Sequence, residues 1–178
     1  MKPDRRTQML RLLALLFVVT LTILIFINRK RVGELEALGY PGIFLVSAIA
    51  NASLILPVPG VLITSAMGAV FNPFWVAVAA GSGATVGEIS GYMAGFGGRG
   101  VVERTRWHER VENWMRRYGS VVVFLLAFFP NPLFDIAGIT AGVLKMPLWR
   151  FLLWCLLGKI LKMLLFAYLG ETMMSWFE

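Results

Sequence analysis

Between Glu36 and Glu88 the chain runs for 51 consecutive residues without an Asp, Glu, Lys or Arg. Soluble domains are about half apolar and about a quarter charged, whereas this chain is 58% apolar and 15% charged. Disordered chains are rich in charge and poor in aromatic residues, so disorder is excluded as well. Because helices satisfy their own backbone hydrogen bonds in lipid, the pattern predicts an all-α integral membrane protein.

An earlier apolar run covers residues 12–27, and basic residues flank it on both sides. A signal peptide would end in small residues at a cleavage site. This run instead ends in Phe26 and Ile27, followed by cations at 29–31. We therefore expect an uncleaved transmembrane helix, which forms an N-terminal anchor over residues 1–36.

Two prolines interrupt the charge-free run. Residues 41–56 and 61–71 are apolar, and Pro57, Pro59 and Gly60 lie between them. Each apolar piece reaches about 16 to 24 Å as a helix, against a hydrocarbon core of about 30 Å. Proline ends or kinks a helix, so we predict a re-entrant hairpin that enters and leaves on the same side. The alternative is a single proline-kinked helix that crosses the membrane.

The next segment, residues 74–96, is long and apolar enough to span. Within it a glycine recurs at every fourth position, and small residues in this spacing let another helix approach closely. The four glycines are Gly83, Gly87, Gly91 and Gly95. Glu88 lies beside this ridge, in the middle of the segment.

Residues 97–118 form a polar linker. Trp107, Val111, Trp114 and Tyr118 fall on one helical face, and cations surround them. This pattern is typical of an amphipathic helix in the plane of the lipid headgroups.

Catalytic and cofactor motifs are lacking. His108 is the single histidine, and no acid–base partner or metal-ligand pattern accompanies it. Residues 95–100 match G-x-G-x-x-G but follow no strand, so the dinucleotide interpretation fails. The basic residues flank apolar runs, and no aromatic-interleaved groove for nucleic acid is present. We expect no enzyme activity, no metal or cofactor and no nucleic-acid partner.

The final third of the chain repeats the second. A short apolar limb at 119–129 leads to a Pro-Asn-Pro break, a second limb at 133–144 and a spanning segment at 146–170. The equivalent positions are Pro57 and Pro130, Pro59 and Pro132, Gly68 and Gly142, Pro73 and Pro147, Trp75 and Trp149. Fifteen residues after the third proline of each half stand Glu88 and Lys162.

Charge placement predicts the topology. Cytoplasmic loops carry an excess of Lys and Arg, which puts the N-terminus and the basic linker 97–118 in the cytoplasm. The two halves then have opposite orientations. We predict a membrane domain over 37–178, with a first repeat at 41–96 and an inverted second repeat at 119–170. Each repeat is a re-entrant hairpin followed by a transmembrane helix, an architecture that transporters use with a binding site at the repeat interface.

Charged residues inside the predicted membrane segments are the candidate site. A charge in the bilayer costs about 3 kcal/mol and therefore usually faces a cavity or a partner. The candidates for a lipid path are Glu88, Asp135, Lys159, Lys162 and the amide Asn131. Alternatives stay open, because Asp135 could cap the helix after Pro132 and the two lysines could reach an interface. The sequence also leaves open whether Glu88 pairs with either lysine.

The chain resembles the DedA/VTT family of membrane proteins over residues 40–170. The P-x-P-G break, Gly87-Glu88 and Tyr92 carry the resemblance, and residues 129–140 with Gly158-Lys159 are similar to the vacuole membrane protein branch. The resemblance implies lipid movement: phospholipid scrambling in eukaryotic members, and undecaprenyl phosphate recycling with proton-dependent physiology in bacterial ones. Two features of bacterial members are missing, an acidic residue at 61–62 and arginines around Pro130.

The leading hypothesis is a lipid translocator, either scramblase-like or a carrier of phospholipid or undecaprenyl phosphate. The alternatives are a proton- or ion-coupled transporter of a small solute, with Glu88 or Asp135 titrating, and a non-transporting scaffold that shapes the membrane. The expected partners are membrane lipids, including anionic headgroups, in a prokaryotic cytoplasmic membrane. Whether the chain forms a homo-oligomer stays open.

Overall fold

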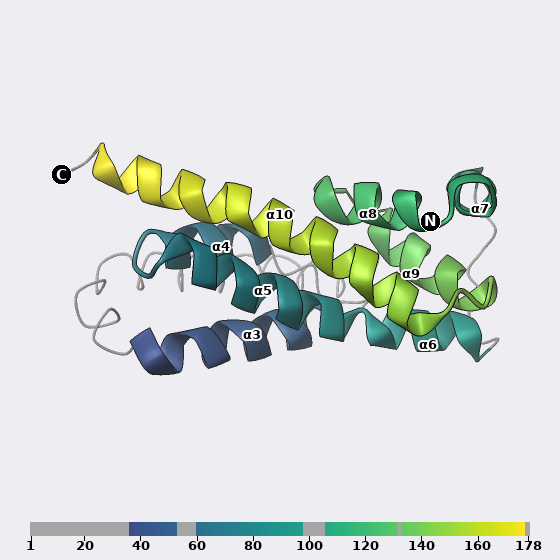
Figure 1. The fold of residues 1–178 in the computed structure, drawn as a ribbon, viewed down its shortest axis with the longest axis horizontal. Helices are drawn as coiled ribbons and strands as arrows, with labels where there is room; N and C mark the ends of the chain where they lie inside the picture. The colour runs from purple at the N-terminus through teal and green to yellow at the C-terminus, as the bar shows by residue number, and fades with distance from the viewer. Residues whose placement is uncertain (1–35, 53–59, 98–105, 132, 177–178) are drawn as a thin grey trace, which may run out of the picture.

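The computed structural model describes residues 36–52, 60–97, 106–131 and 133–176, and every regular element in these ranges is an α-helix (Figure 1). The helices are α3 (Glu36–Ala52), α4 (Gly60–Gly68), α5 (Pro73–Gly87), α6 (Ile89–Phe96), α7 (Arg106–Tyr118), α8 (Ser120–Phe128), α9 (Phe134–Val143) and α10 (Leu148–Ser175). The all-α prediction is confirmed for this part of the chain. The N-terminal anchor expected over residues 1–36 lies almost entirely outside the described residues, as do Pro57, Pro59 and Pro132.

Helix α10 is the longest element and runs the length of the bundle (Figure 1). Among the described residues, its stretch Leu148–Met173 is the one long and apolar enough to cross a membrane. Five side chains spaced four apart face inward, and five leucines with the same spacing are about half exposed. The inward row is Phe151, Cys155, Lys159, Met163 and Ala167, and the outward row is Leu153, Leu157, Leu161, Leu165 and Leu169. An exposed leucine row of this length suits lipid rather than water.

The glycine-rich segment was expected as one helix over 74–96, but the structure divides it into α5 and α6 at Glu88. The helical bonding continues across the division. The Glu88 N–H donates to the Ala84 carbonyl at 3.3 Å, and the Tyr92 N–H donates to the Glu88 carbonyl at 3.1 Å. The two helices therefore follow one another along one line with a local irregularity at Glu88 (Figure 1).

Helices α5 and α6 together run antiparallel to α10. Gly81 near the middle of α5 abuts Ile160, whereas Tyr92 on α6 stacks on Phe151 near the start of α10, with ring centroids 5.4 Å apart. Residue numbers thus rise along one rod as they fall along the other. The two rods cross the bundle in opposite directions.

Two short helices pack across the bundle in matching ways. Helix α4 packs on α10, and helix α9 packs on α6. A Cβ added at Gly170 would collide with the Ser65 carbonyl, and one added at Gly95 would collide with the Ile139 carbonyl. Ser65 and Ile139 lie 74 positions apart, which is the offset that aligns the two halves of the sequence. The glycines that they contact, Gly95 and Gly170, lie 75 positions apart, so the two crossings are similar and agree with that offset to within one residue.

The glycine ridge is divided between two partners. Gly83 and Gly87 approach the carbonyls of Phe44 and Ala48 on α3, and Gly95 approaches α9. Among the described residues, nothing lies within 4 Å of where a Cβ on Gly91 would stand. Glycine at positions 83, 87 and 95 lets backbones touch, as small residues do in membrane helix packing.

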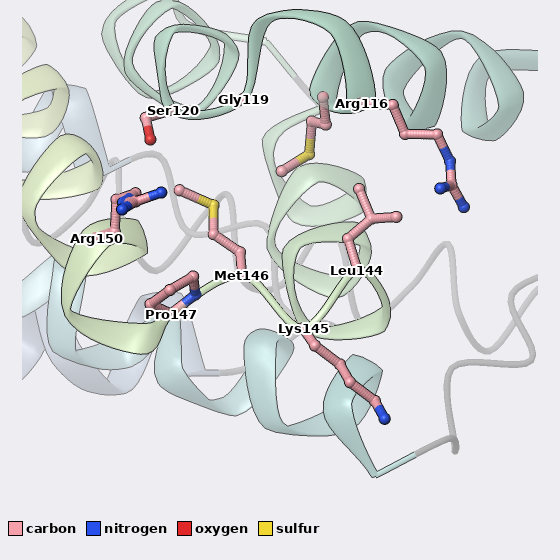
Figure 2. A pocket seen from close by; sticks show the side chains of 9 residues that line it. Arg116, Gly119, Ser120, Leu144, Lys145, Met146, Pro147 and Arg150 are labelled. Atoms are coloured by element: carbon pink, nitrogen blue, oxygen red, sulfur yellow. The ribbon is translucent and has the colours of Figure 1, made fainter.

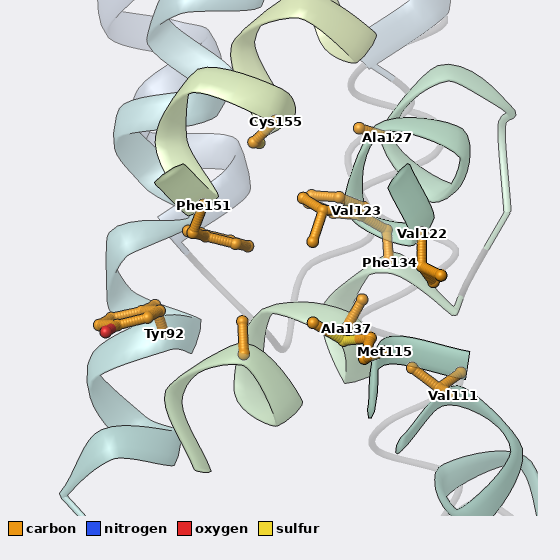
Figure 3. Packing of buried hydrophobic residues seen from close by; sticks show 11 residues of the cluster. Tyr92, Val111, Met115, Val122, Val123, Ala127, Phe134, Ala137, Phe151 and Cys155 are labelled. Carbon is orange, nitrogen blue, oxygen red and sulfur yellow. The ribbon is translucent and has the colours of Figure 1, made fainter. Parts of the chain in front are cut away.

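Buried apolar side chains form two clusters on either side of the middle of α10. One joins α6, α7, α8, α9 and the start of α10 around Phe151 and Val123 (Figure 3). The other joins α3, α5 and the far half of α10 around Val76 and Met163. The polar centre of the molecule lies between these clusters.

Candidate functional site: a buried lysine–glutamate pair

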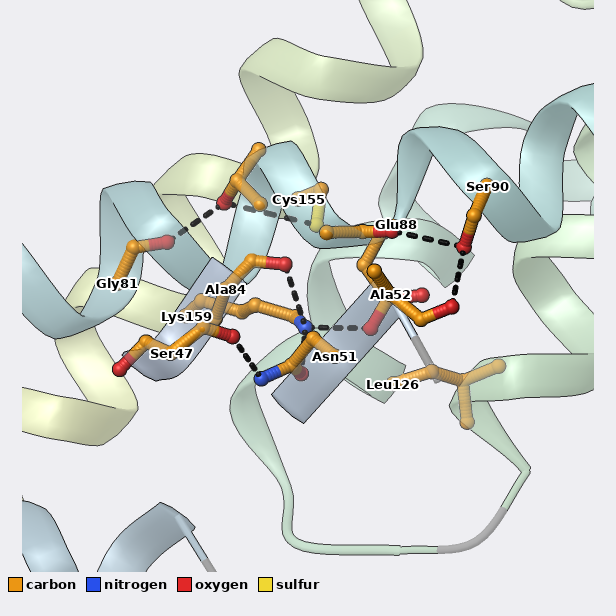
Figure 4. A network of polar contacts seen from close by, with 12 residues as sticks. Ser47, Asn51, Ala52, Gly81, Ala84, Glu88, Ser90, Leu126, Cys155 and Lys159 are labelled. Carbon is orange, nitrogen blue, oxygen red and sulfur yellow. Dashed lines mark hydrogen bonds and ion pairs between the residues drawn. The ribbon is translucent and has the colours of Figure 1, made fainter. Parts of the chain in front are cut away.

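Lys159, halfway along α10, carries a charge in the interior of the bundle. Its side chain is 2% exposed, and that of Glu88 is 5% exposed. The Lys159 Nζ donates to Glu88 Oε1 at 2.5 Å (Figure 4). The two residues come from the two antiparallel rods and lie 71 positions apart. The alternative in which Lys159 reaches an interface is therefore wrong.

The other donors of Lys159 also have partners. Its ammonium donates to Asn51 Oδ1 at 2.7 Å and to the Ala84 carbonyl at 3.3 Å. The ammonium also lies 4.9 Å from the centroid of the Phe134 ring. Asn51 is oriented by its own amide, which donates to the Ser47 carbonyl at 2.8 Å. Because an ammonium has three donors, the lysine is fully satisfied.

Close helix packing makes this arrangement possible. Gly87 immediately precedes Glu88, and a Cβ at Gly87 would lie 2.8 Å from the Asn51 Cβ. Glycine there allows α3 to come close enough for Asn51 to reach Lys159. Ser90 also connects α6 to α3, because its hydroxyl donates to the Ala52 carbonyl at 3.0 Å. A charged pair thus sits where three helices meet.

Breaking such a pair costs more free energy than its presence contributes to stability. Desolvating two charges offsets most of their attraction, so a buried pair adds little net stability. Removing one partner leaves the other charge buried and alone, which costs about 3 to 5 kcal/mol. A group of this kind is a weak way to stabilise a fold and a common component of functional sites inside membranes.

Asp135 and Lys162 lie near the pair but are more accessible. Asp135 is exposed in the first turn of α9, and Lys162 is half-buried one turn beyond Lys159 on α10. Asp135 interacts electrostatically with both lysines. Leu133 occupies the N-cap of α9 without a side-chain capping bond. The idea that Asp135 caps this helix is therefore wrong.

Asn131 has a different surrounding from the other candidates. Its amide lies within hydrogen-bonding distance of the Leu126 carbonyl at 2.9 Å and the Phe129 carbonyl at 2.7 Å. Its Oδ1 accepts from the Leu133 N–H at 2.9 Å. These bonds shape the turn between α8 and α9 beside the exposed Pro130.

At the other break, Gly60 is the first residue of α4.

Sequence reasoning missed Asn51 and two polar neighbours. The Cys155 thiol lies 3.8 Å from the Thr85 hydroxyl, next to the pair. A signal for Asn51 existed, since the charge-free run contains two amide side chains, Asn51 and Asn72. Asn72 caps α5 by accepting from backbone N–H groups, whereas the Asn51 amide bonds within α3 and leaves its Oδ1 to accept from Lys159.

Comparison with known proteins places the chain. Residues 58–172 match the model of the VTT domain. The chain belongs to the VTT domain family. The resemblance seen in the sequence is thus confirmed, and with it the expectation of a membrane protein.

Curated relatives come from bacteria, plants and animals. The chain is 32% identical over 148 residues to undecaprenyl phosphate transporter A of Bacillus subtilis (strain 168), covering 76% of this chain and 72% of the relative. It is 33% identical over 79 residues to vacuole membrane protein KMS1 of Arabidopsis thaliana, covering 39% of this chain and 19% of the relative. Vacuole membrane protein 1 of Bos taurus is 44% identical over 54 residues, covering 30% and 13%.

The matched segments thus span a fifth or less of these two vacuole membrane proteins. The relatives are named as transporters or membrane proteins and not as enzymes. No solved structure matches the chain.

Proposed function

We propose that this VTT protein moves lipids across the bilayer, either as a scramblase-like protein or as a carrier of phospholipid or undecaprenyl phosphate. The observation that carries the proposal is the match to undecaprenyl phosphate transporter A, which extends over 76% of the chain. A lipid with a charged headgroup needs polar partners inside the membrane, and the Glu88–Lys159 pair supplies a candidate.

The architecture supports a transport role. We interpret α3–α4 and α8–α9 as two re-entrant hairpins, and α5–α6 and α10 as their following transmembrane helices. The antiparallel rods and the similar crossings of α4 on α10 and of α9 on α6 fit repeats of opposite orientation. Transporters built in this way bind their substrate between the repeats, near the bilayer midplane.

The gradient of exposure suggests how a headgroup would travel. Asp135 is exposed, Lys162 is half-buried and Lys159 is buried. A lipid phosphate that passed Lys162 would compete with Glu88 for the Lys159 ammonium, since both anions accept charge-assisted hydrogen bonds. The lysine would exchange one anion for another without becoming an isolated buried charge. When no lipid is bound, Glu88 would pair with Lys159 again.

Purified protein in liposomes tests this function. Fluorescent phospholipid and a polyprenyl phosphate should equilibrate between leaflets without ATP or an imposed gradient. Glu88→Gln keeps the size of the side chain but leaves the buried Lys159 without its anion, so lipid movement should fall by about tenfold or more. Glu171→Gln is the matched control, because Glu171 is an exposed carboxylate near the end of α10, away from the buried pair. Wild-type protein that leaves lipid asymmetry intact contradicts the proposal.

A second candidate is a proton- or ion-coupled transporter of a small solute. The observation that favours it is the same buried carboxylate, because membrane carboxylates often relay protons in transporters. The liposomes separate the two candidates. A coupled carrier requires a pH or ion gradient and leaves fluorescent lipids in place, whereas a scaffold shows neither activity.

A further inference from the structure

A second cluster of charge lies at the other end of the domain, where α7, α8 and the α9–α10 turn meet. A cavity of about 430 Å³ opens there, and Arg116, Lys145, Arg150 and Ser120 supply its polar lining. Arg150 precedes Lys159 by nine residues, or about 13 Å along the helix axis. The cavity is therefore distinct from the buried pair.

The side chains of the cavity favour an anion. Figure 2 shows the Arg150 guanidinium and the Ser120 hydroxyl projecting into the space between the starts of α8 and α10. Arg116 and Lys145 stand at the rim and point outward (Figure 2). Arg116 pairs with Glu112 at 2.8 Å, and no acidic residue is among the described residues that line the cavity. Positive charge thus exceeds negative charge here.

Two helices also begin at this cavity. Helix α8 starts at Ser120 and helix α10 starts at Leu148, and the residues just before them, Gly119 and Pro147, line the wall. The first turn of a helix leaves backbone N–H groups without intrahelical partners, and its end carries partial positive charge. Phosphate groups bind at such helix starts. This contribution is independent of the basic side chains and has the same sign.

The turn that forms one wall is held in a defined shape. Lys145 has φ of 51°, and its N–H donates to the Gly142 carbonyl at 3.0 Å. The Met146 N–H donates to the Ala141 carbonyl at 3.0 Å, which completes a Schellman motif at the end of α9. Tyr92 fixes the turn from α6, since its hydroxyl donates to the Met146 carbonyl at 2.6 Å. Glycine is the usual residue at this position of a Schellman motif, because a positive φ is unfavourable for residues with a side chain. Here the position is occupied by a lysine.

We propose that this cavity binds the phosphate group of an anionic lipid in the leaflet at this end of the bundle and presents the lipid for translocation. The inference rests on the proposed function and adds the place where the headgroup first docks. Apolar side chains of Met115, Leu144 and Met146 complete the lining. Trp149 beside it is 65% exposed, as aromatic residues at a membrane interface are. A cavity that is both basic and apolar suits a lipid better than a free ion.

Direct binding measured by calorimetry tests the docking site without requiring transport. The ligand is dihexanoyl phosphatidic acid, which is water-soluble, titrated into the purified full chain in detergent. Arg150→Gln should weaken binding by about tenfold, since it removes a charge-assisted contact. Ser120→Ala should weaken binding by about threefold. Dihexanoyl phosphatidylcholine, whose headgroup has no net charge, should bind the wild-type chain more weakly.

Arg117→Gln is the matched control. Arg117 and Arg150 each lie over the ring of the neighbouring aromatic residue, at 5.3 Å from Tyr118 and 5.4 Å from Trp149. The two substitutions therefore remove the same charge from similar surroundings, but Arg117 is not part of the cavity lining. Arg117→Gln should change the affinity by less than about twofold. Equal losses in both variants would indicate general attraction to a basic surface and overturn the site.

The remaining outcomes separate the possible ligands and the two proposals. Wild-type affinity in Arg150→Gln overturns the docking site, and helical content measured by circular dichroism checks that this variant is folded. Inorganic phosphate that binds as tightly as the short-chain lipid overturns the lipid assignment in favour of a free anion. Tight, Arg150-dependent binding by a wild-type chain that fails to move lipids in liposomes supports the docking site and contradicts the proposed function alone.

Discussion

The buried pair and the basic cavity are both charged, but they balance charge in opposite ways. At the centre, Lys159 meets Glu88, Asn51 and a backbone carbonyl, and its side chain is 2% exposed. At the end of the bundle, Arg150 is exposed and faces a cavity that no acidic residue lines in the described part of the chain. The first arrangement satisfies a charge internally, whereas the second leaves a charge for a ligand.

This difference separates two tasks that lipid translocation requires. A site that collects a headgroup from the leaflet must be open and have an excess of positive charge. A site within the membrane must avoid an isolated charge when no lipid is present, because such a charge is costly there. We expect substitutions in the centre to affect folding and transport together. Removing the charge of a cavity side chain such as Arg150 should affect binding and leave folding intact.

The largest effect should come from breaking the pair. Lys159→Met leaves the Glu88 carboxylate buried without its partner, so the free energy of unfolding should fall by about 3 to 5 kcal/mol. Adding Glu88→Leu removes the orphaned charge and should recover most of that loss. Unfolding titrations in detergent measure both variants. If the double variant is as unstable as the sum of the single ones, the two residues do not form a pair.

A smaller loss should follow from separating the helices around the pair. Gly87→Ala adds a methyl group that collides with the Ala48 carbonyl on α3, and overpacking of this kind costs about 1 to 3 kcal/mol. The added methyl group should also push Asn51 away from Lys159. Gly91→Ala is the control, because no atom of the described residues lies within 4 Å of its added Cβ. The same unfolding titrations apply, and equal losses in the two variants would contradict the close contact of α3 with α5.

Salt should distinguish the two regions directly. Screening weakens interactions of exposed charges beyond about 8 to 10 Å at near-physiological ionic strength and acts much less on buried pairs. Raising NaCl from about 50 mM to about 500 mM should weaken phosphatidic acid binding several-fold. The contribution of the Glu88–Lys159 pair to the free energy of unfolding should change by less than about 0.5 kcal/mol over the same range. Lipid binding that is insensitive to salt would place the ligand away from Arg150.

The smallest effect concerns the turn at Lys145. Lys145→Gly relieves the positive φ and should stabilise the protein by about 0.5 to 1 kcal/mol, whereas Lys145→Ala keeps the strain. Both variants remove the rim charge, so both should weaken phosphatidic acid binding to the same modest extent. Comparing thermal unfolding with binding separates strain from charge. If Lys145→Ala stabilised the protein as much as Lys145→Gly, the positive φ of Lys145 would not be the cause of the stabilisation.

Several features of the fold followed from local pattern. The spacing of Pro73 and Pro147 and of Gly68 and Gly142 predicted two matching halves, and the structure has two similar helix crossings within one residue of that offset. The division at Glu88 was not foreseen. The segment 74–96 contains no proline, and its glycines recur along its length without singling out Glu88, where tertiary contacts with α3 and α10 act.

The sequence by itself determined that the chain is helical and belongs in a membrane, because apolar length and the scarcity of charge depend only on neighbouring residues. It also singled out Glu88 and two lysines as charges in apolar surroundings. Lys159 and Lys162 lie three residues apart on one helix and are equivalent by that criterion. Only the tertiary structure decided that Lys159 pairs with Glu88, because it sets which face of α10 meets α5. The third partner, Asn51, lies 108 positions from Lys159, and only the packing of α3 against Gly87 brings it there.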